Sequence, residues 1–367
     1  MLEDQEYILK KVLKIIDDEK PDGVMIAGDV YDKSVPSAQA VEMLDSFLVS
    51  LAQKGVEVFL ISGNHDSPER LAFGGRLMEK SGIHISPVYD GKVEPVSLVD
   101  EHGKVNIYML PFIKPAHVRA VFPDEEIESY TDAVRKAVSE MEPDQEARNV
   151  LIAHMFVTGA ERTDSEDVSI GGADNVDASV FGCFDYVALG HLHRPQNVAV
   201  AGTAQVRYCG TPLKYSFSET DDEKSVTVVE IGAKEGNMVD INTILVPLEP
   251  MRDMVRIRGS YDELTQKSFY EGTSLTDDYV HITLTDEDDV IDAAAKLRVI
   301  YRNLMELRYD NTRTRSDSRL AEIEKIEEKT PIELFGDLFE KQNGRPMTDE
   351  QSGFIAGLIE KIWEDEE

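Results

Sequence analysis

The chain has 367 residues, of which 41% are hydrophobic and 30% are charged. This composition is typical of a soluble globular protein with two or three domains, and it excludes a disordered chain. The net charge of −33 argues mildly against DNA binding by the isolated chain, because proteins that bind phosphates usually carry a basic surface. Bound divalent metals are the exception, since they supply positive charge locally.

The apolar segments are all shorter than the roughly 20 residues that cross a bilayer, and the first residues lack the features of a signal peptide. The two cysteines, Cys183 and Cys209, are too few for a disulfide framework. We therefore expect a cytoplasmic protein with reduced cysteines and no contact with a membrane.

The first part of the chain alternates helical and strand patterns. Residues 3–19 have helical spacing, and residues 23–27 are typical of a buried strand. A second helix begins near Pro36 and ends before Gly55, and the next strand covers residues 56–61. Strand, helix and strand in this order predict a sheet covered by helices, and therefore an α/β fold.

Strand patterns recur further along the chain. Residues 149–153 and 186–189 are both apolar and short, as buried strands are. The stretch 208–247 is rich in strand patterns, above all over residues 225–230 and 241–246. We expect these last two strands to belong to a second sheet that closes the domain.

A potential metal ligand follows each of four apolar strands. These ligands are Asp29, then Asn64 with His65, then His154, and finally His191 with His193. Ligands of α/β sheets bind beyond the carboxyl ends of the strands, so we expect these side chains to converge. Each motif alone could be an ordinary turn, a surface histidine or a core histidine, but four such endings together favour a metal site. Oxygen and nitrogen ligands without a thiolate suit Mn²⁺, Fe or Zn²⁺.

The chemistry of such a site points to phosphate esters. A carboxylate such as that of Asp29 can bridge two ions, which is the arrangement of two-metal phosphoesterases. Two ions lower the pKa of a bridging water and hold the phosphoryl oxygens. His65 could then protonate the leaving oxygen, and Asp66 could orient His65.

The motifs also resemble a known superfamily. Gly28-Asp29, the run Gly63-Asn64-His65-Asp66, His154 and the run Gly190-His191-Leu192-His193 resemble, in this order, the motifs of calcineurin-like metallophosphoesterases. The flanking sequences IAGDVYD, SGNHDSPERLAFG, FDYVALGHLHRPQNV and YCGTPLKYSFSE resemble the SbcD family, the nuclease subunits of bacterial SbcCD complexes. The tail sequence TPIELFGDLFEKQNGRPMTDEQ extends this resemblance over essentially the whole chain.

The resemblance implies a fold and three segments. Residues 1–247 are expected to form a metallophosphoesterase nuclease domain, a two-sheet sandwich flanked by helices whose first strand is missing. Residues 248–310 are expected to form a small α+β capping domain, with strands over 254–257 and 279–284 and a helix over 290–307.

The tail, residues 311–367, is expected to hold a polar link and acidic helices. Leu334, Phe335, Leu338 and Phe339 share one helical face, and Thr348 with Gln351 forms a capping box for the last helix. These faces either pack on the body of the protein or contact a partner. The resemblance implies the second role, with an ATPase as the partner.

The resemblance also implies roles for the site residues. Asp29 bridges two divalent ions, Mn²⁺ above all; Asn64, His154 and His191 complete one site, and His193 serves the other. The implied activity is exonuclease and endonuclease cleavage of DNA ends and hairpins in repair, recombination and replication. The implied partners are DNA and an SbcC-type coiled-coil ATPase, with the chain as a homodimer within a heterotetramer. Arg194, Tyr215 and Ser216 lie where DNA contacts are expected, and a packing role stays open for each.

The chain departs from the superfamily pattern at one place. The superfamily carries an Asp-x-His motif at the end of its first strand, which supplies two ligands to the site of His193, and no such strand and motif precede the first helix here. The explanations are a mis-assigned start or a truncation, a strand donated by a partner, or a pseudoenzyme that serves as a non-catalytic scaffold. We expect this chain to bind the ion of Asn64, His154 and His191, the second ion, better than the ion that His193 serves, the first. We also expect little or no nuclease activity. A phosphoesterase acting on another phosphate ester is a further alternative.

Overall fold

The computed structural model describes residues 2–163, 174–200 and 202–314, with Phe335, Phe339, residues 347–348, Gln351 and Ile355. The chain divides into two compact units. The first holds Met1–Ile257, Thr265–Ile282 and Ala294–Leu307, and the second holds Arg258–Leu264, Thr283–Ala293 and Arg308–Glu367. None of the helices in these described ranges is long and apolar enough to cross a membrane.

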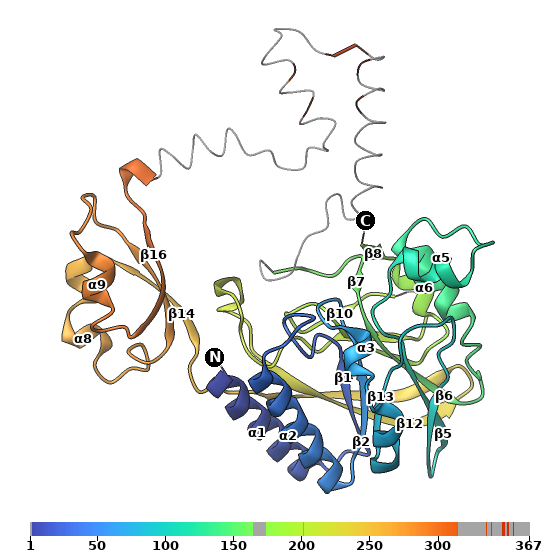
Figure 1. Cartoon of the computed structure of the whole chain (residues 1–367). Coiled ribbons are helices and arrows are strands. Elements are labelled where there is room, and N and C mark those ends of the chain that lie inside the picture. Colours follow the sequence, from blue (N-terminus) through green and yellow to red (C-terminus); the bar gives the residue numbers. More distant parts are fainter. Residues whose placement is uncertain are drawn as a thin grey trace. The chain divides into compact units, whose positions relative to one another are not determined.

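Helices and strands alternate over the first half of the chain, and strands dominate afterwards (Figure 1). The elements up to β9 are α1 (Leu2–Glu19), β1 (Gly23–Ala27), α2 (Ala38–Lys54), β2 (Glu57–Ile61), α3 (Pro68–Leu71), α4 (Gly75–Met78), η1 (Glu79–Ser81), β3 (Ile83–Ile85), β4 (Val96–Asp100), β5 (Gly103–Met109), α5 (Pro115–Val121), α6 (Tyr130–Ser139), β6 (Arg148–His154), β7 (Phe156–Val157), β8 (Asn175–Val176), η3 (Ala178–Phe181) and β9 (Tyr186–Gly190). The later elements are β10 (Gln196–Val198), β11 (Gln205–Tyr208), η4 (Phe217–Glu219), β12 (Ser225–Glu235), β13 (Met238–Pro247), β14 (Met254–Gly259), α7 (Tyr261–Leu264), α8 (Lys267–Tyr270), β15 (Tyr279–Leu284), α9 (Ala293–Leu297) and β16 (Asn303–Tyr309).

The first sheet is parallel and has the order β1-β2-β3. Helices α1 and α2 cover it, because Ile16 of α1 and Leu51 of α2 pack in one apolar cluster with Leu60 of β2. Helix α2 is capped by Ser37, whose side chain accepts the backbone N–H of Ala40, and it ends at a left-handed glycine, Gly55. The helix and strands predicted for residues 3–61 are therefore confirmed to within about two residues at each end.

The second sheet has the order β10-β11-β9-β6-β5-β4. Its centre, from β11 to β5, is parallel, and the edge strands β10 and β4 are antiparallel to their neighbours. Phe59 and Ile61 of β2 share an apolar cluster with Val150 and Ile152 of β6, so the two sheets pack face to face. The predicted two-sheet sandwich flanked by helices is confirmed.

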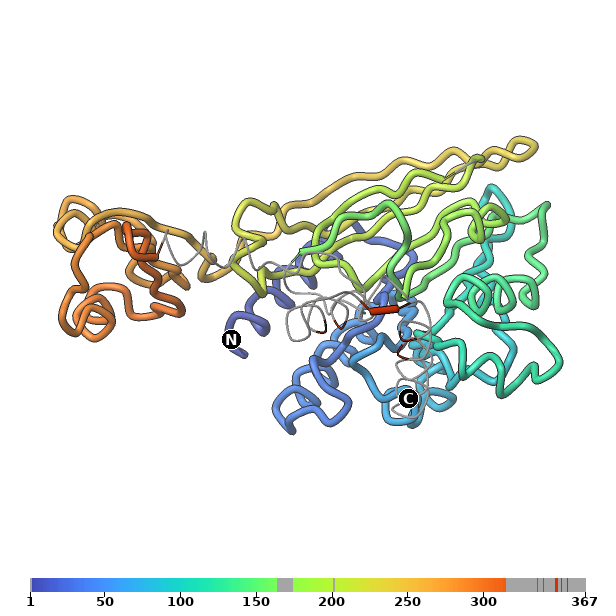
Figure 2. Tube along the Cα trace, turned by 90° about the horizontal axis from the view of Figure 1, so that it is seen from above, coloured from blue at the N-terminus to red at the C-terminus, as the bar shows by residue number. Residues whose placement is uncertain are grey.

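Strands β12 and β13 form a long antiparallel hairpin, which runs as two adjacent strands from yellow-green to yellow in Figure 2. Val229, Ile231 and Ile241 pack against the cluster between the two main sheets. The hairpin is longer than predicted. Strand β13 alternates between exposed and half-buried residues over most of its length, most of β12 is half-buried, and neither strand has a fully buried residue, so a run of apolar side chains does not mark the full length of the hairpin.

The segment after the hairpin holds the sheet β14-β15-β16. The helix expected over residues 290–307 is wrong, because α9 ends at Leu297 and residues 303–309 form β16 beside β15. Ile300, Leu304 and Leu307 have helical spacing in the sequence. Pairing with a neighbouring strand overrides this local pattern.

Most of the tail lies outside the described residues, including the face of Leu334 and Leu338. Its capping box is confirmed: Thr348 N–H donates to Gln351 Oε1 at 3.1 Å, and Gln351 N–H donates to Thr348 Oγ1 at 3.3 Å. The predicted domain boundaries at 247 and 310 stay predictions.

Candidate metal centre

The carboxyl ends of four strands carry the predicted ligands. Asp29 lies two residues beyond β1 and Asn64 lies three residues beyond β2, while His154 is the last residue of β6 and His191 follows β9. His154 is the pairing partner of Gly190, which places His191 next to it. The structure therefore brings Asp29, His154 and His191 together, with one potential ligand atom of each within 4.8 Å of the others.

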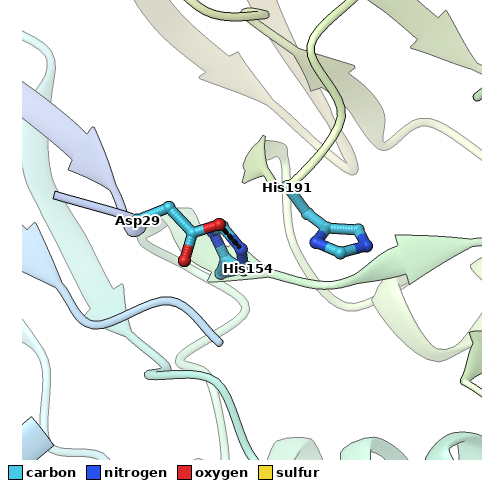
Figure 3. Close-up of side chains that lie close together, drawn as sticks. All are labelled: Asp29, His154 and His191. Carbon is cyan, nitrogen blue, oxygen red and sulfur yellow. Dashed lines mark ion pairs between the residues drawn. The ribbon is translucent and has the colours of Figure 1, made fainter. Parts of the chain in front are cut away.

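Short contacts join these side chains. His154 Nε2 lies 3.1 Å from Asp29 Oδ2 and 3.0 Å from Asn64 Oδ1, and Asn64 Oδ1 lies 3.2 Å from His191 Nδ1. In Figure 3 the carboxylate of Asp29 points toward the His154 ring, and a dashed line marks the contact between Asp29 Oδ2 and His154 Nε2. Asn64 thus belongs to the same cluster as the three groups at the other strand ends.

The tautomer of His154 follows from its second ring nitrogen. Nδ1 lies 2.8 Å from the carbonyl oxygen of Ala27, which can only accept, so Nδ1 carries the proton. The lone pair of Nε2 then faces the oxygens of Asp29 and Asn64, which are acceptors as well. His154 is only 1% exposed, so water cannot easily relieve this arrangement. Lone pairs that converge without a proton between them fit a bound cation.

The His191 ring is suited to the same task. Burial, supported by the neighbouring His154, lowers its pKa from 6.5 to about 4. The ring is therefore neutral at neutral pH and keeps a lone pair for an ion.

Two glycines allow the loops to approach this closely. A Cβ atom on Gly63 would lie 2.1 Å from Asp29 Oδ1, and a Cβ atom on Gly190 would lie 1.8 Å from the Ala27 carbonyl oxygen. Any side chain at these positions would therefore move Asp29 or the end of β1.

Asp66 joins the two loops that carry Asp29 and Asn64. It is 7% exposed, and it accepts the backbone N–H groups of Val30 at 3.1 Å, Tyr31 at 3.0 Å and Gly63 at 2.9 Å. Burial raises the pKa of Asp66 above its ordinary value, against the lowering effect of these three bonds. Both carboxylate oxygens of Asp66 face backbone amides. The role of Asp66 in orienting His65 stays a prediction, and Asp66 would act on His65 through the loop backbone.

His65 is an exposed residue beside Asp29. Its backbone N–H donates to Asp29 Oδ1 at 3.0 Å. This bond fixes the loop beside Asp29, and the imidazole stays accessible to a substrate.

His193 lies outside the cluster of Asp29, His154 and His191. Its Nδ1 is 3.1 Å from Oε1 of Glu219, and its ring packs edge-on against Tyr215 with centroids 5.8 Å apart. Sequence reasoning missed Glu219. It stands 26 residues from His193, and no ligand spacing connects the two.

The three residues predicted to contact DNA have different surroundings. Arg194 donates to Asp222 at 2.8 Å and to Glu161 at 3.2 Å, so carboxylates balance its charge. Tyr215 is 38% exposed beside His193, and the hydroxyl of Ser216 caps the short 3-10 helix η4. Of the three, Tyr215 has the most accessible side chain next to a predicted ligand.

Comparison with known proteins adds an independent line of evidence. A family model described as calcineurin-like phosphoesterase matches residues 2–195, which include every predicted metal ligand. A model described as type 5 capsule protein repressor C-terminal domain matches residues 250–343. The chain is also similar to a protein from Staphylococcus epidermidis that is named as the D subunit of the nuclease SbcCD, with 32% identity over 369 residues that cover 99% of this chain and 94% of that relative.

Proposed function

Because the chain belongs to the SbcD family of calcineurin-like phosphoesterases, we propose that it is the metal-dependent nuclease subunit of an SbcCD-type complex. In this proposal it hydrolyses phosphodiester bonds as an exonuclease and endonuclease at DNA ends and hairpins, in repair, recombination and replication. The observation that carries the proposal is the convergence of Asp29, Asn64, His154 and His191 at the strand ends.

Two divalent ions belong to the proposed site, and the described cluster supplies the ligands of one of them. Asp29, Asn64, His154 and His191 would hold one ion, and Asp29 would share the other with His193. Nitrogen and oxygen ligands without sulfur suit Mn²⁺. When bound, such ions supply an activated water and neutralise charge on the phosphate.

The protein's own groups prepare the site for a phosphate ester. His154 is held by the Ala27 carbonyl and keeps Nε2 directed at Asp29. The exposed His65 would lie against the substrate and protonate or hydrogen-bond the leaving oxygen. Tyr215 would contact DNA at the side of His193, and Arg194 and Ser216 would act there only indirectly, because Arg194 is paired with carboxylates and Ser216 caps η4.

The proposed partner is a coiled-coil ATPase of the SbcC type. The similar protein from Staphylococcus epidermidis is named as one subunit of SbcCD, and that similarity covers 99% of this chain. We place the contact with the ATPase in residues 311–367. The chain would form a homodimer within a heterotetramer in the cytoplasm.

Two alternatives differ from this proposal in what they predict. One is a phosphoesterase that acts on another phosphate ester with the same cluster. The other is a non-catalytic scaffold for the ATPase, which is suggested by the position of His193 outside the cluster of Asp29, His154 and His191. The sequence similarity to a nuclease subunit favours the DNA substrate.

One experiment separates the three functions. The chain is assayed with and without an added N-terminal segment that ends in Asp-x-His, in Mn²⁺, on hairpin DNA and on a cyclic nucleotide. We expect the extended chain to cleave the hairpin on the order of 100-fold faster than its Asp29→Asn variant. Cleavage of the cyclic nucleotide alone would support the other phosphoesterase, and an extended chain that binds Mn²⁺ and cleaves neither substrate would support the scaffold.

A further inference from the structure

Glu219 is a fully buried carboxylate next to a predicted metal ligand. Its exposed fraction is 0%, and it lies at the end of η4. Oε1 lies 3.1 Å from His193 Nδ1 and accepts the backbone N–H of Tyr215 at 3.3 Å. Oε2 accepts Nζ of Lys224 at 2.6 Å, and the Lys224 side chain is only 3% exposed. Both oxygens of Glu219 therefore accept from buried or partly buried donors, and Oε1 also faces the histidine.

This contact determines which nitrogen of His193 carries the proton. Because the Glu219 oxygens act as acceptors, the ring nitrogen that faces Oε1 is the donor, which places the proton on Nδ1 and the lone pair on Nε2. A histidine that binds a metal usually donates its other ring N–H to a carboxylate or a carbonyl in this way. His154 shows the same arrangement with the carbonyl oxygen of Ala27.

Lys224 fixes the backbone of the same histidine. Nζ donates to the carbonyl oxygen of His193 at 2.8 Å and to Thr211 Oγ1 at 3.1 Å, and Thr211 N–H also donates to His193 O at 3.1 Å. One buried ion pair therefore restrains both the ring and the main chain of His193. Buried ion pairs add little net stability compared with apolar packing, so this pair is better explained by the geometry that it imposes.

We propose that Glu219 is a positioning residue that holds His193 as the Nδ1–H tautomer and directs Nε2 toward the position of a divalent ion. Lys224 balances the charge of Glu219 and holds the peptide of His193. The inference rests on the proposed function only in taking His193 as a metal ligand. It would bring His193 under the same type of control as His154.

The Glu219→Gln variant tests this role. The Lys224 ammonium would attract the amide oxygen and turn the amide NH₂ toward His193, which favours the Nε2–H tautomer. Long-range ¹⁵N NMR of the histidine side chains, in metal-free protein at a pH where they are neutral, reports the tautomer directly. The His193→Asn variant assigns the signal. We expect Nδ1–H in the wild-type chain and a shift toward Nε2–H in Glu219→Gln. In the chain that carries the added N-terminal Asp-x-His segment, we expect Glu219→Gln to bind Mn²⁺ about 10–100-fold more weakly at the site that His193 serves.

Asp185→Asn is the matched control, because Asp185 is a buried carboxylate that pairs with Lys234 at 3.2 Å in another part of the same domain. It should lower stability and leave the tautomer of His193 unchanged. An Nε2–H tautomer in the wild-type chain would overturn the proposal even if Glu219→Gln does not fold. In the chain with the added N-terminal Asp-x-His segment, Mn²⁺ affinity that responds to neither His193→Asn nor Glu219→Gln would overturn it as well. These measurements need no DNA cleavage, so a chain with the expected tautomer and metal affinity but no nuclease activity would refute only the proposed function.

Discussion

The carboxylate of Asp66 joins two loops through three backbone amides, those of Val30, Tyr31 and Gly63. Removing the acceptor from partly buried N–H groups costs about 1–3 kcal/mol for each group that finds no water. We therefore expect Asp66→Ala to lower the free energy of unfolding by about 2 kcal/mol or more, measured by urea denaturation.

Two further variants control that measurement. Asp66→Asn keeps one acceptor oxygen and should cost less than Asp66→Ala. Asp17→Ala removes an exposed carboxylate that pairs with Lys54, so its cost should stay within about 1 kcal/mol. A loss below about 1 kcal/mol for Asp66→Ala would show that Asp66 does not hold the loops.

Single residues differ in how far the sequence could predict them. Asp29, His154 and His191 could be predicted as site residues because each lies at or just after the end of an apolar strand, and strand ends meet at one edge of a sheet. The backbone partners of Asp66 and the contact of Glu219 with His193 could not be predicted from the sequence. They depend on how loops far apart in the chain pack against each other, which no local pattern encodes.

At the level of elements, Arg148 ties β6 to two neighbouring hairpins. It is 1% exposed, and Nη1 donates to Asp100 Oδ2 and to Ile231 O, both at 2.9 Å, while Nη2 donates to Gly103 O at 2.8 Å. We expect Arg148→Met to lower the free energy of unfolding by about 3 kcal/mol, because the Asp100 carboxylate and the backbone carbonyls of Gly103, Ile231 and Gly232 lose their buried donor. Arg135→Met is the matched control, since Arg135 is exposed and pairs only with Asp132 among its described ion pairs.

The loss of unfolding free energy in Arg148→Met should depend on pH. The hydrogen bond from Arg148 holds the pKa of Asp100 below its ordinary value of 3.8. A carboxyl group whose pKa is lowered by folding contributes stability above its unfolded pKa and loses it as the pH falls through the folded pKa. The difference between wild type and variant should therefore shrink below about pH 4, and a difference that stays constant in urea titrations would contradict this assignment.

The strands were more predictable than the other elements. Short apolar runs such as Val150 to Ala153 and Tyr186 to Leu189 are buried in the sandwich, so their sequence alone identifies them. The helix expected over residues 290–307 failed, since residues 303–309 pair with β15 and local spacing cannot report a distant strand. The hairpin β12–β13 was found but its length was underestimated, because none of its residues is fully buried and a run of apolar side chains does not mark its ends.

For the molecule as a whole, composition and family pointed in different directions. The net charge of −33 argued against DNA binding, whereas the motifs and the similar protein indicate a nuclease subunit. Net charge averages over the whole surface, and it says little about a site where bound ions supply the positive charge. The family could be identified from the sequence because its motifs are short and local. The surroundings of His193 could not be predicted in this way, since they depend on the fold.

The most direct test of the metal centre is the position of Mn²⁺ in an anomalous difference map from crystals grown with the ion. A chain with 71 acidic residues offers many weak cation sites, so binding alone does not locate the centre. We expect the strongest peak among Asp29, Asn64, His154 and His191, with ligand distances of roughly 2.0–2.6 Å. A map without a peak there, and with Mn²⁺ only at surface carboxylates, would contradict the account.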